Sequence, residues 1–429
     1  MKPTSEEKFL NLSAVMNTNT KTNKTTKAQI TTAAKSAVVQ TRTGVETPEQ
    51  RARVKRVLVA TDLHKSTCKV TTILSGSAAQ PPQTISTDGM VAWTTRQQAR
   101  YPNARFYIGY EAGPCGYWLQ RELAKLKGTE ECIVMAPEPL NAKRKNDKRD
   151  SRALARKMRH YYDEGDPAAL SKVRVPTLEE EQKRSVPRHR RALLKTYGQL
   201  VMRCRSMALL HGCTLKGKFW KGEDWEKTLP GKLPPQIRKN MASLRAVILV
   251  VVEQIAAYNE QIATMAAQEG PAPHGIGALT WLTLKLEMGD WNRFTGRRAV
   301  ASYTGLCPGE HSSGEHRVEL SIDKMGNRRV RHELIEAAWR MERHQPAYPP
   351  VVKFLGRAKG PRARRRAIVA VARQLAIDLW RINTGRASAQ QVGLHYANEK
   401  TPPPPDAAPP KNARTNDKPN KQTRKKNDA

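Results

Sequence analysis

The feature that most constrains the fold is a change of sequence pattern near Arg188. Before it, short apolar and β-branched runs alternate with segments of helical character. After it, the strand signal disappears and long helical segments follow. Alternating strands and helices are typical of an α/β layer structure, whereas uninterrupted helical periodicity is typical of helices packed on helices. The sequence therefore predicts an α/β domain followed by an all-α part.

The predicted sheet begins with three strands before the first helix. Short apolar or β-branched runs of this kind, bounded by turn residues, indicate strands. Three strands followed by alternation of strand and helix predict a mixed sheet. The expected strands are residues 57–60, 68–74, 83–86, 106–110 and 132–135, and the expected helices are residues 90–100, 117–127 and 150–162.

Two long helices are predicted in the second part, over residues 191–210 and 235–268. The second repeats Leu244, Ile248, Val251, Ile255 and Ile262 at helical spacing, which suits a helix hairpin or an inter-subunit coiled coil. The expected organisation is a disordered basic arm (1–52), the α/β domain (53–187), a helical, coiled-coil-like linker (188–268), a helical C-terminal domain (269–390) and a disordered tail (391–429).

The charge of the chain indicates a polyanionic partner. Lys and Arg number 75 against 39 Asp and Glu, a formal net charge of +36, and clustered cations gain affinity by releasing counterions from phosphates. The longest apolar run, residues 246–252, is too short to span a membrane, and residues 1–12 lack the apolar core of a signal peptide. No membrane association is expected, and the six scattered cysteines suit reduced thiols in a cytoplasmic protein.

Four carboxylates stand at positions where active sites gather. Asp62 follows the first strand, Glu111 follows the fourth, and Asp147 and Asp150 share one face at the start of the next helix. Carboxylates held together repel one another unless divalent cations bridge them, and Mg²⁺ prefers oxygen ligands. Each acid has a simpler alternative as a turn residue, helix cap or favourable charge at a helix start.

Several residues of the second part are candidates for nucleic-acid contact. A Gly-x-Gly turn before a helix could present free N–H groups to a phosphate, although it could equally be an ordinary helix cap. The basic residues could equally form solvated surfaces. The candidates are Gly275, Gly277, Lys324, Arg328, Arg329, Arg331, Arg364, Arg365 and Arg366.

Ordered motifs in both parts resemble one family. In the first part they are Ala60-Thr61-Asp62, Tyr110-Glu111-Ala112-Gly113 and Asp147-Lys148-Arg149-Asp150; in the second they are Gly275-Ile276-Gly277, Gly289-Asp290, Arg293-Phe294, Gly305-Leu306-Cys307-Pro308, Ser313-Gly314 and Lys324-Met325-Gly326-Asn327. The pattern resembles the DEDD-type transposases of the insertion-sequence "one-ten" family. These RuvC-like recombinases are related to the pilin-gene DNA invertases.

The resemblance implies a site in each part. It implies a ribonuclease-H/RuvC-like fold whose metal-binding catalytic tetrad is Asp62, Glu111, Asp147 and Asp150, loaded with Mg²⁺ or with Mn²⁺ as a substitute. It also places the family's nucleophilic serine at Ser313, with Ser312 as the adjacent competitor. The chain departs from the family at Ser151 (usually Ala), at Asp323 (usually Ser or Thr), and in a segment from 313 to 324 that is about one residue short.

The implied function is metal-dependent DNA strand cleavage and exchange through a phosphoserine intermediate. The implied partners are double-stranded DNA at the element ends and target, a structured guide RNA and further copies of the chain in a tetramer, in a prokaryotic cytoplasm at the nucleoid. Two alternatives stay open from the residues alone. One is a hydrolytic nuclease that resembles a Holliday-junction resolvase, and the other is a catalytically inactive, basic nucleic-acid-binding relative.

Overall fold

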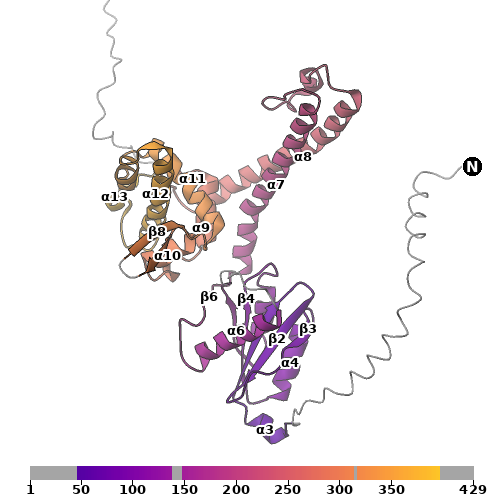
Figure 1. Cartoon of the computed structure of the whole chain (residues 1–429), viewed down its shortest axis with the longest axis vertical. Helices are drawn as coiled ribbons and strands as arrows, with labels where there is room; N and C mark the ends of the chain where they lie inside the picture. The colour runs from indigo at the N-terminus through magenta and orange to yellow at the C-terminus, as the bar shows by residue number, and fades with distance from the viewer. Residues whose placement is uncertain (1–45, 138–146, 314–315, 397–429) are drawn as a thin grey trace, which may run out of the picture. The chain divides into compact units, whose positions relative to one another are not determined.

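The computed structural model describes residues 46–137, 147–313 and 316–396, without the side chains of 147–149 and 310–320. Nearly all of the expected N-terminal arm and most of the expected tail lie outside these residues. The chain divides into two compact units, Met1–Val175 and Pro176–Ala429, which are described separately (Figure 1).

The first unit is built on one mixed sheet of six strands in the order β3-β2-β1-β4-β5-β6. β1, β4 and β5 run parallel to one another, whereas β2, β3 and β6 are each antiparallel to the neighbour that precedes them in the chain. The strands are β1 (Arg56–Leu63), β2 (Thr67–Leu74), β3 (Gln83–Ser86), β4 (Arg105–Glu111), β5 (Thr129–Met135) and β6 (Lys172–Val173). The predicted mixed sheet is confirmed, and β6, a two-residue strand, was not predicted.

Helices cover both faces of this sheet (Figure 1). Alternate residues of β1 divide between two cores: Val57 and Val59 pack with the helices α4 (Met90–Arg100) and α5 (Trp118–Ala124), whereas Leu58 and Ala60 pack with α6 (Asp147–Tyr162). This alternation follows from the two-residue period of a strand. A short helix, α3 (Pro48–Ala52), precedes β1.

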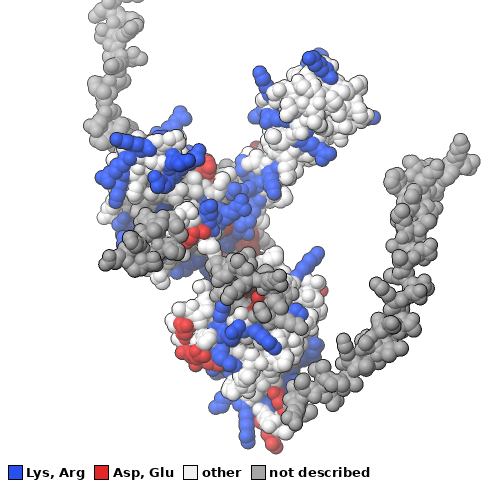
Figure 2. All heavy atoms as spheres, viewed as in Figure 1, with Lys and Arg blue, Asp and Glu red and all other residues white. Residues whose placement is uncertain are grey.

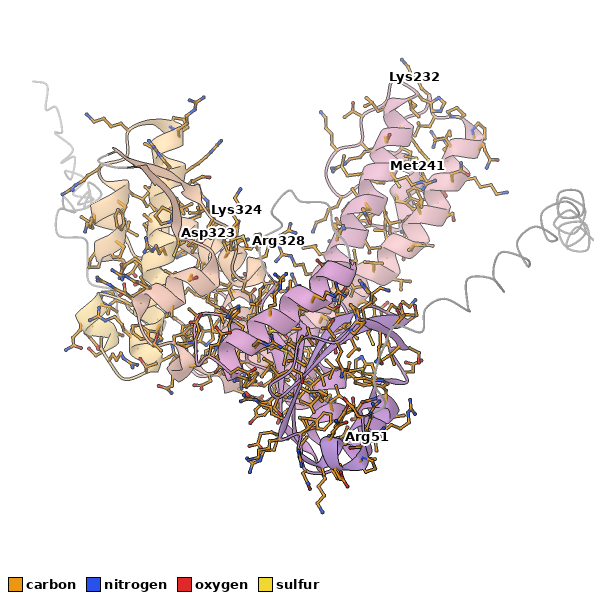
Figure 3. All side chains as sticks on the ribbon, turned by 60° about the horizontal axis from the view of Figure 1, so that its bottom comes forward. Arg51, Lys232, Met241, Asp323, Lys324 and Arg328 are labelled. Atoms are coloured by element: carbon orange, nitrogen blue, oxygen red, sulfur yellow. The ribbon has the colours of Figure 1, made fainter. Side chains whose placement is uncertain are left out.

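The second unit begins with a long helix hairpin. α7 (Leu178–Leu209) starts at a capping box formed by Thr177 and Glu180 and contains Pro187, so it begins 13 residues before the predicted start at 191. α8 (Pro235–Gln268) has the predicted bounds. The tip contains the 3₁₀ helix η1 (Glu223–Thr228), and a small aromatic core with Trp220 and Trp225 holds it together. Figure 3 shows Lys232 at the tip and Met241 between the two helices.

The remaining elements of the second unit surround a large apolar core. They are α9 (Ala278–Met288), η2 (Trp291–Arg293), α10 (Arg297–Thr304), β7 (Pro308–Ser313), β8 (His316–Ile322), α11 (Arg328–His344), η3 (Val351–Leu355), α12 (Gly360–Asn383) and α13 (Ala389–Val392). The prediction of an all-α part was wrong in one respect, because β7 and β8 form an antiparallel hairpin within it. The alternating segment 318–322 contained the strand signal.

One helix among the described residues is long and apolar enough to cross a membrane: α8, whose most apolar 18-residue window is 17% buried. The apolar run 246–252 lies inside α8. The 18-residue window is longer than this run because it also includes alanines and a few polar residues, and its mean hydropathy remains high. Core helices of soluble proteins satisfy the same criterion. The six cysteines are all free, as expected.

Candidate functional site

The carboxyl ends of β1 and β4 place Asp62 beside Glu111. These neighbouring strands are parallel, and the Cα of Thr61 pairs with that of Tyr110, so the next residue of each strand is an acid at the same edge of the sheet. Both acids are half-buried. The strand register therefore brings the first two predicted acids together.

Asp62 and Glu111 also share a face of the sheet. Asp62 lies two residues after Ala60, and Glu111 two residues after Gly109, which places both on the face that α6 covers. Gly109 permits a close approach there, because a Cβ at this position would lie 2.8 Å from the Met158 sulfur of α6. The missing side chain lets the helix pack directly on the strand that carries Glu111.

The start of α6 reaches the same edge. The Thr71 hydroxyl of β2 donates a 3.0 Å hydrogen bond to Ser151, and both side chains are fully buried. Thr71 pairs with Ala60 of β1, so Ser151 is fixed close to the strand end that carries Asp62. Asp150 adjoins Ser151 and is half-buried, whereas the side chain of Asp147 is outside the description. The hydroxyl of Ser151, a departure from the family pattern, thus has a partner in Thr71.

Asp62 lies near a polar residue, His64, and near a buried one, Cys68. His64 Nε2 lies 3.3 Å from an Asp62 carboxylate oxygen. Burial, reinforced by the Asp62 charge, raises the pKa of the Cys68 thiol to about 11, which keeps this cysteine protonated at neutral pH. Among the described side chains, no three His, Cys, Asp or Glu residues are close enough together to hold a metal ion. The donor types suit Mg²⁺, but the described members alone do not complete a site.

The predicted nucleophile lies at the end of the β7–β8 hairpin. Ser313 is the last residue of β7, and its Cα pairs with that of His316; Ser312 precedes it and pairs with Arg317. The side chains of this segment are not described, so the structure gives the position of the serine on the hairpin and not the direction of its hydroxyl.

The base of the hairpin is held by two interlocked glycines. Gly305 adopts a left-handed conformation (φ 65°), and a Cβ there would lie 2.7 Å from the Gly326 nitrogen. A Cβ at Gly326 would collide with the Tyr303 carbonyl oxygen. The Lys324 nitrogen donates to the Gly305 carbonyl at 3.2 Å. The Gly-Leu-x-Pro and Lys-x-Gly-Asn motifs therefore meet backbone to backbone. Figure 3 labels Asp323 and Lys324 on this loop and Arg328 at the start of α11.

A buried carboxylate, Glu287 of α9, joins this loop to the long hairpin. Its oxygens accept hydrogen bonds from Arg188 Nε at 2.8 Å and Nη2 at 2.9 Å, and from Asn327 Nδ2 at 3.1 Å. Asn327 in turn caps α11 by accepting from the backbone N–H of Arg329 and Val330. Burial favours the neutral acid, but the hydrogen bonds and charge of Arg188, with Asn327 and Arg329, lower the pKa of Glu287 below its usual value.

Two hollows in the described part of the second unit are lined by several arginines. The first, the α7–α9–α11 cleft, has a volume of about 530 Å³ and is lined by Arg188, Arg191 and Arg329 above the buried acids Glu287 and Glu333. The second, which we call the arginine pocket, has a volume of about 840 Å³ and lies among α10, η3, α12 and the β7–β8 hairpin. Figure 2 shows Lys and Arg side chains gathered over one face of the C-terminal helices.

The predicted nucleic-acid-binding residues fall into several environments. Gly277 and Arg329 line the cleft, and Arg365 and Arg366 line the arginine pocket. Lys324 is exposed on the loop before α11, and Arg328 is exposed at the first position of α11.

Besides Arg329, which lies 3.9 Å from Glu287, three more of the predicted residues have contacts within the protein. Gly275 packs against His344, because a Cβ there would lie 2.8 Å from the His344 Cβ. Arg331 donates to the Thr304 carbonyl at 3.1 Å. Arg364 pairs with Glu342 at 2.6 Å. These contacts within the protein explain the presence of the three residues, and no nucleic-acid ligand is needed to explain them.

Sequence reasoning missed several residues that the fold brings to these places. Arg188 and Glu287 are 99 residues apart, and no local pattern pairs them. Arg297 and Arg298 follow Gly296 at the start of α10, a basic pair at a helix N-terminus that deserved notice. Arg373 lies seven residues after Arg366, two helical turns along the same face of α12, and this spacing was a usable signal.

Comparisons with known proteins connect both units to one group. Residues 273–351 match the family described as "Transposase IS116/IS110/IS902 family". Over 384 residues, 81% of this chain and 95% of the relative, the sequence is 29% identical to "Putative transposase y4rJ" of Sinorhizobium fredii. It is 32% identical to "Putative transposase y4qE" of the same organism, over 57% of this chain and 59% of the relative.

A third relative comes from another bacterium. The "Transposase for insertion sequence element IS1111A" of Coxiella burnetii is 27% identical over 63% of this chain and 76% of the relative. All three relatives are named as transposases, and the third is named for an insertion sequence element.

Proposed function

We propose that this chain is a DNA transposase of the IS116/IS110/IS902 family that cuts and rejoins DNA strands. The observation that carries the proposal is the sheet edge of the first unit. There the strand register brings Asp62 beside Glu111, and the Thr71–Ser151 hydrogen bond fixes the start of α6 close by. Carboxylates at the carboxyl ends of neighbouring parallel strands are a common basis for catalytic sites in α/β folds.

The sheet itself supports a ribonuclease-H/RuvC-like first unit. Three consecutive antiparallel strands are followed by two strands parallel to the first, in the order β3-β2-β1-β4-β5. A helix from the following segment, which begins with the other two predicted acids, packs on one face. In such a topology, acids that are far apart in the sequence would meet at one edge of the sheet.

Asp62, Glu111, Asp147 and Asp150 would together hold Mg²⁺, or Mn²⁺ as a substitute. When bound, the metal would neutralise phosphate charge and stabilise the leaving oxygen. His64 beside Asp62 would keep that carboxylate oriented. Because carboxylates are hard oxygen donors, they suit these cations better than they suit softer metals.

Ser313 would be the nucleophile. Its hydroxyl oxygen would attack a DNA phosphorus, losing its proton as the Oγ–P bond forms and the bond from phosphorus to one sugar oxygen breaks. The released sugar hydroxyl takes up a proton. Attack by another sugar hydroxyl would reverse the step, free the serine and rejoin the strand, so the exchange needs no external energy source.

We further propose a structured guide RNA as a partner and a tetramer as the assembly. The net charge of +36 suits binding to two nucleic acids. The outer face of α8 supports self-association, because Val247 and Val250 are 47% and 57% exposed, and such residues are buried more often than not.

The experiment is to incubate the protein with Mg²⁺, element-junction DNA and RNA transcribed from the flanking non-coding DNA, then run the quenched mixture on a denaturing gel. A protein band shifted by covalently bound DNA is expected from the parent and from Ser312→Ala, and not from Ser313→Ala. Nicked DNA without an adduct would favour the hydrolytic nuclease. Binding without cleavage would favour the inactive relative.

A further inference from the structure

The arginine pocket combines positive charge that no described acid neutralises with an apolar floor. Arg297 and Arg298 enter it from the start of α10, and Arg365, Arg366 and Arg373 enter it from α12. The lining residues include no Asp or Glu, and none of the five arginines forms an ion pair with a described acid. All but Arg373 are exposed.

The α7–α9–α11 cleft provides a contrast within the same unit. Three of the five arginines that line it lie beside acids of the protein: Arg188 pairs with Glu287 at 2.8 Å, Arg329 lies 3.9 Å from Glu287, and Arg191 approaches Glu333 at 4.0 Å. Those three charges contribute to the fold. In the arginine pocket no described acid takes up the charge of any arginine, which leaves that charge for an anionic ligand.

The floor of the pocket is suited to a flat apolar group. Leu306, Phe354, Val369 and Ile377 line it beneath the arginines. Phe354 and Val369 are half-buried, so their side chains still present surface to the hollow. A site for phosphate alone needs only the charged rim, whereas this floor favours a ligand that also has an apolar face.

The pocket adjoins the base of the hairpin that carries Ser313. Pro308 of β7 and Ser321 and Ile322 of β8 form one of its walls. Ser313 lies five residues after Pro308 along β7, which is at most about 17 Å of extended strand. A nucleic-acid strand that passes Ser313 can therefore place a nucleotide a few positions away in the pocket.

We infer that the arginine pocket binds an unpaired nucleotide, with its phosphates on the arginines and its base on the apolar floor. This inference deepens the proposed function and rests on it for the source of the strand. A duplex stacks its bases away from such a floor, whereas single strands are bound by a basic groove combined with apolar or aromatic contacts to the bases.

The test compares the binding of two labelled strands to the full chain by fluorescence anisotropy. One is oligothymidine of about 12 nucleotides, and the other is an abasic sugar-phosphate strand of equal length and charge. The parent protein should bind oligothymidine about tenfold more tightly. Phe354→Ala and the milder Val369→Asn should reduce this preference to about twofold or less. Val352→Ala, an exposed change in the same short helix, should retain it.

The rim is tested by salt dependence. Arg366→Gln should lower the slope of log K against log[salt] for both strands by about 0.7, the value for one lost contact to a single strand. Arg362→Gln, on the same helix but outside the lining, should leave the slope unchanged. Circular dichroism confirms that each variant folds.

The outcomes separate the inference from the proposed function. Equal affinity of the parent for the two strands overturns the inference, as does a base preference that survives both floor variants. A chain that forms the serine adduct without any base preference overturns the inference alone. A chain with the base preference but no adduct overturns the proposed function alone.

Discussion

Replacing Arg188 by Met should reverse the way in which the stability of the second unit depends on pH. In the parent, Glu287 adds stability as the pH rises; in the variant, it should remove stability as the pH rises. The substitution keeps the apolar part of the side chain and removes the two hydrogen bonds to Glu287. Glu287, whose side chain is 3% exposed, then has a buried charge supported only by Asn327 and the more distant Arg329.

The expected loss of stability depends on how Glu287 responds, because it can either stay charged or take up a proton, and the less costly response prevails. Leaving a buried charge without its partner costs about 3–5 kcal/mol. Taking up a proton instead costs about 3.4 kcal/mol at pH 7, since each pH unit above the ordinary pKa of 4.5 costs about 1.36 kcal/mol. The loss of stability at pH 7 should therefore be about 3 kcal/mol.

The pH dependence follows from the direction of the pKa shift. In the parent, the pKa of Glu287 is lowered by Arg188, so its contribution is present above pH 4.5 and is lost as the pH falls through the folded-state pKa. In Arg188→Met, burial is no longer outweighed and raises that pKa. The stability of the variant should then fall as the pH rises above 4.5 and level off above the new pKa.

The measurement is hydrogen exchange of peptides from α9 and α11 at several pH values, corrected for the intrinsic exchange rate. Glu287→Gln is the matched comparison, because an amide retains the shape and cannot titrate. Two results would refute the argument that Glu287 is a buried, charged group paired with Arg188: a loss of stability below about 1 kcal/mol at pH 7, or a loss of stability in Arg188→Met that does not change with pH.

Three further predictions concern other parts of the chain. Ser151→Ala should cost about 1–2 kcal/mol because the buried Thr71 hydroxyl loses its acceptor, and adding Thr71→Val should recover most of it in urea unfolding. Gly326→Ala should abolish the serine adduct by displacing the hairpin base, with a new protease cut between α10 and α11 as the readout; an intact adduct would contradict the interlock. Val250→Glu should lower the molar mass seen by light scattering while changing monomer stability by less than about 0.5 kcal/mol, and an unchanged mass would remove α8 from the interface.

The sheet was predictable because its signals are local. The β-branched run 67–74 and the apolar runs of β1, β4 and β5 each reveal a strand without knowledge of its neighbours. The adjacency of Asp62 and Glu111 also followed, because parallel strands end at a common edge. By contrast, β6 is a two-residue strand that is defined only by its pairing with β5. No local sequence pattern predicts it.

The C-terminal sites were less predictable because they depend on packing between distant segments. Arg188 and Glu287 meet only after the long hairpin folds back onto α9. The charges of the arginine pocket converge only after α10 packs against α12. The roles of Gly305 and Gly326 were also hidden, since a motif shows that a glycine is present but not which backbone it contacts.

The close contact between Gly305 and Gly326 fixes the base of the β7–β8 hairpin, and this sets the distance from the base to Ser313. The hairpin is anchored at Gly305 and Gly326, so the number of residues in its strands determines how far out Ser313 stands, by about 3.4 Å for each residue. Adding one residue to a regular strand would also turn every later side chain to the other face. The pairing here is irregular between Pro308 and Glu310, and such a bulge absorbs a single residue. A hairpin with this irregularity can thus gain or lose one residue there without turning the residues beyond it to the other face.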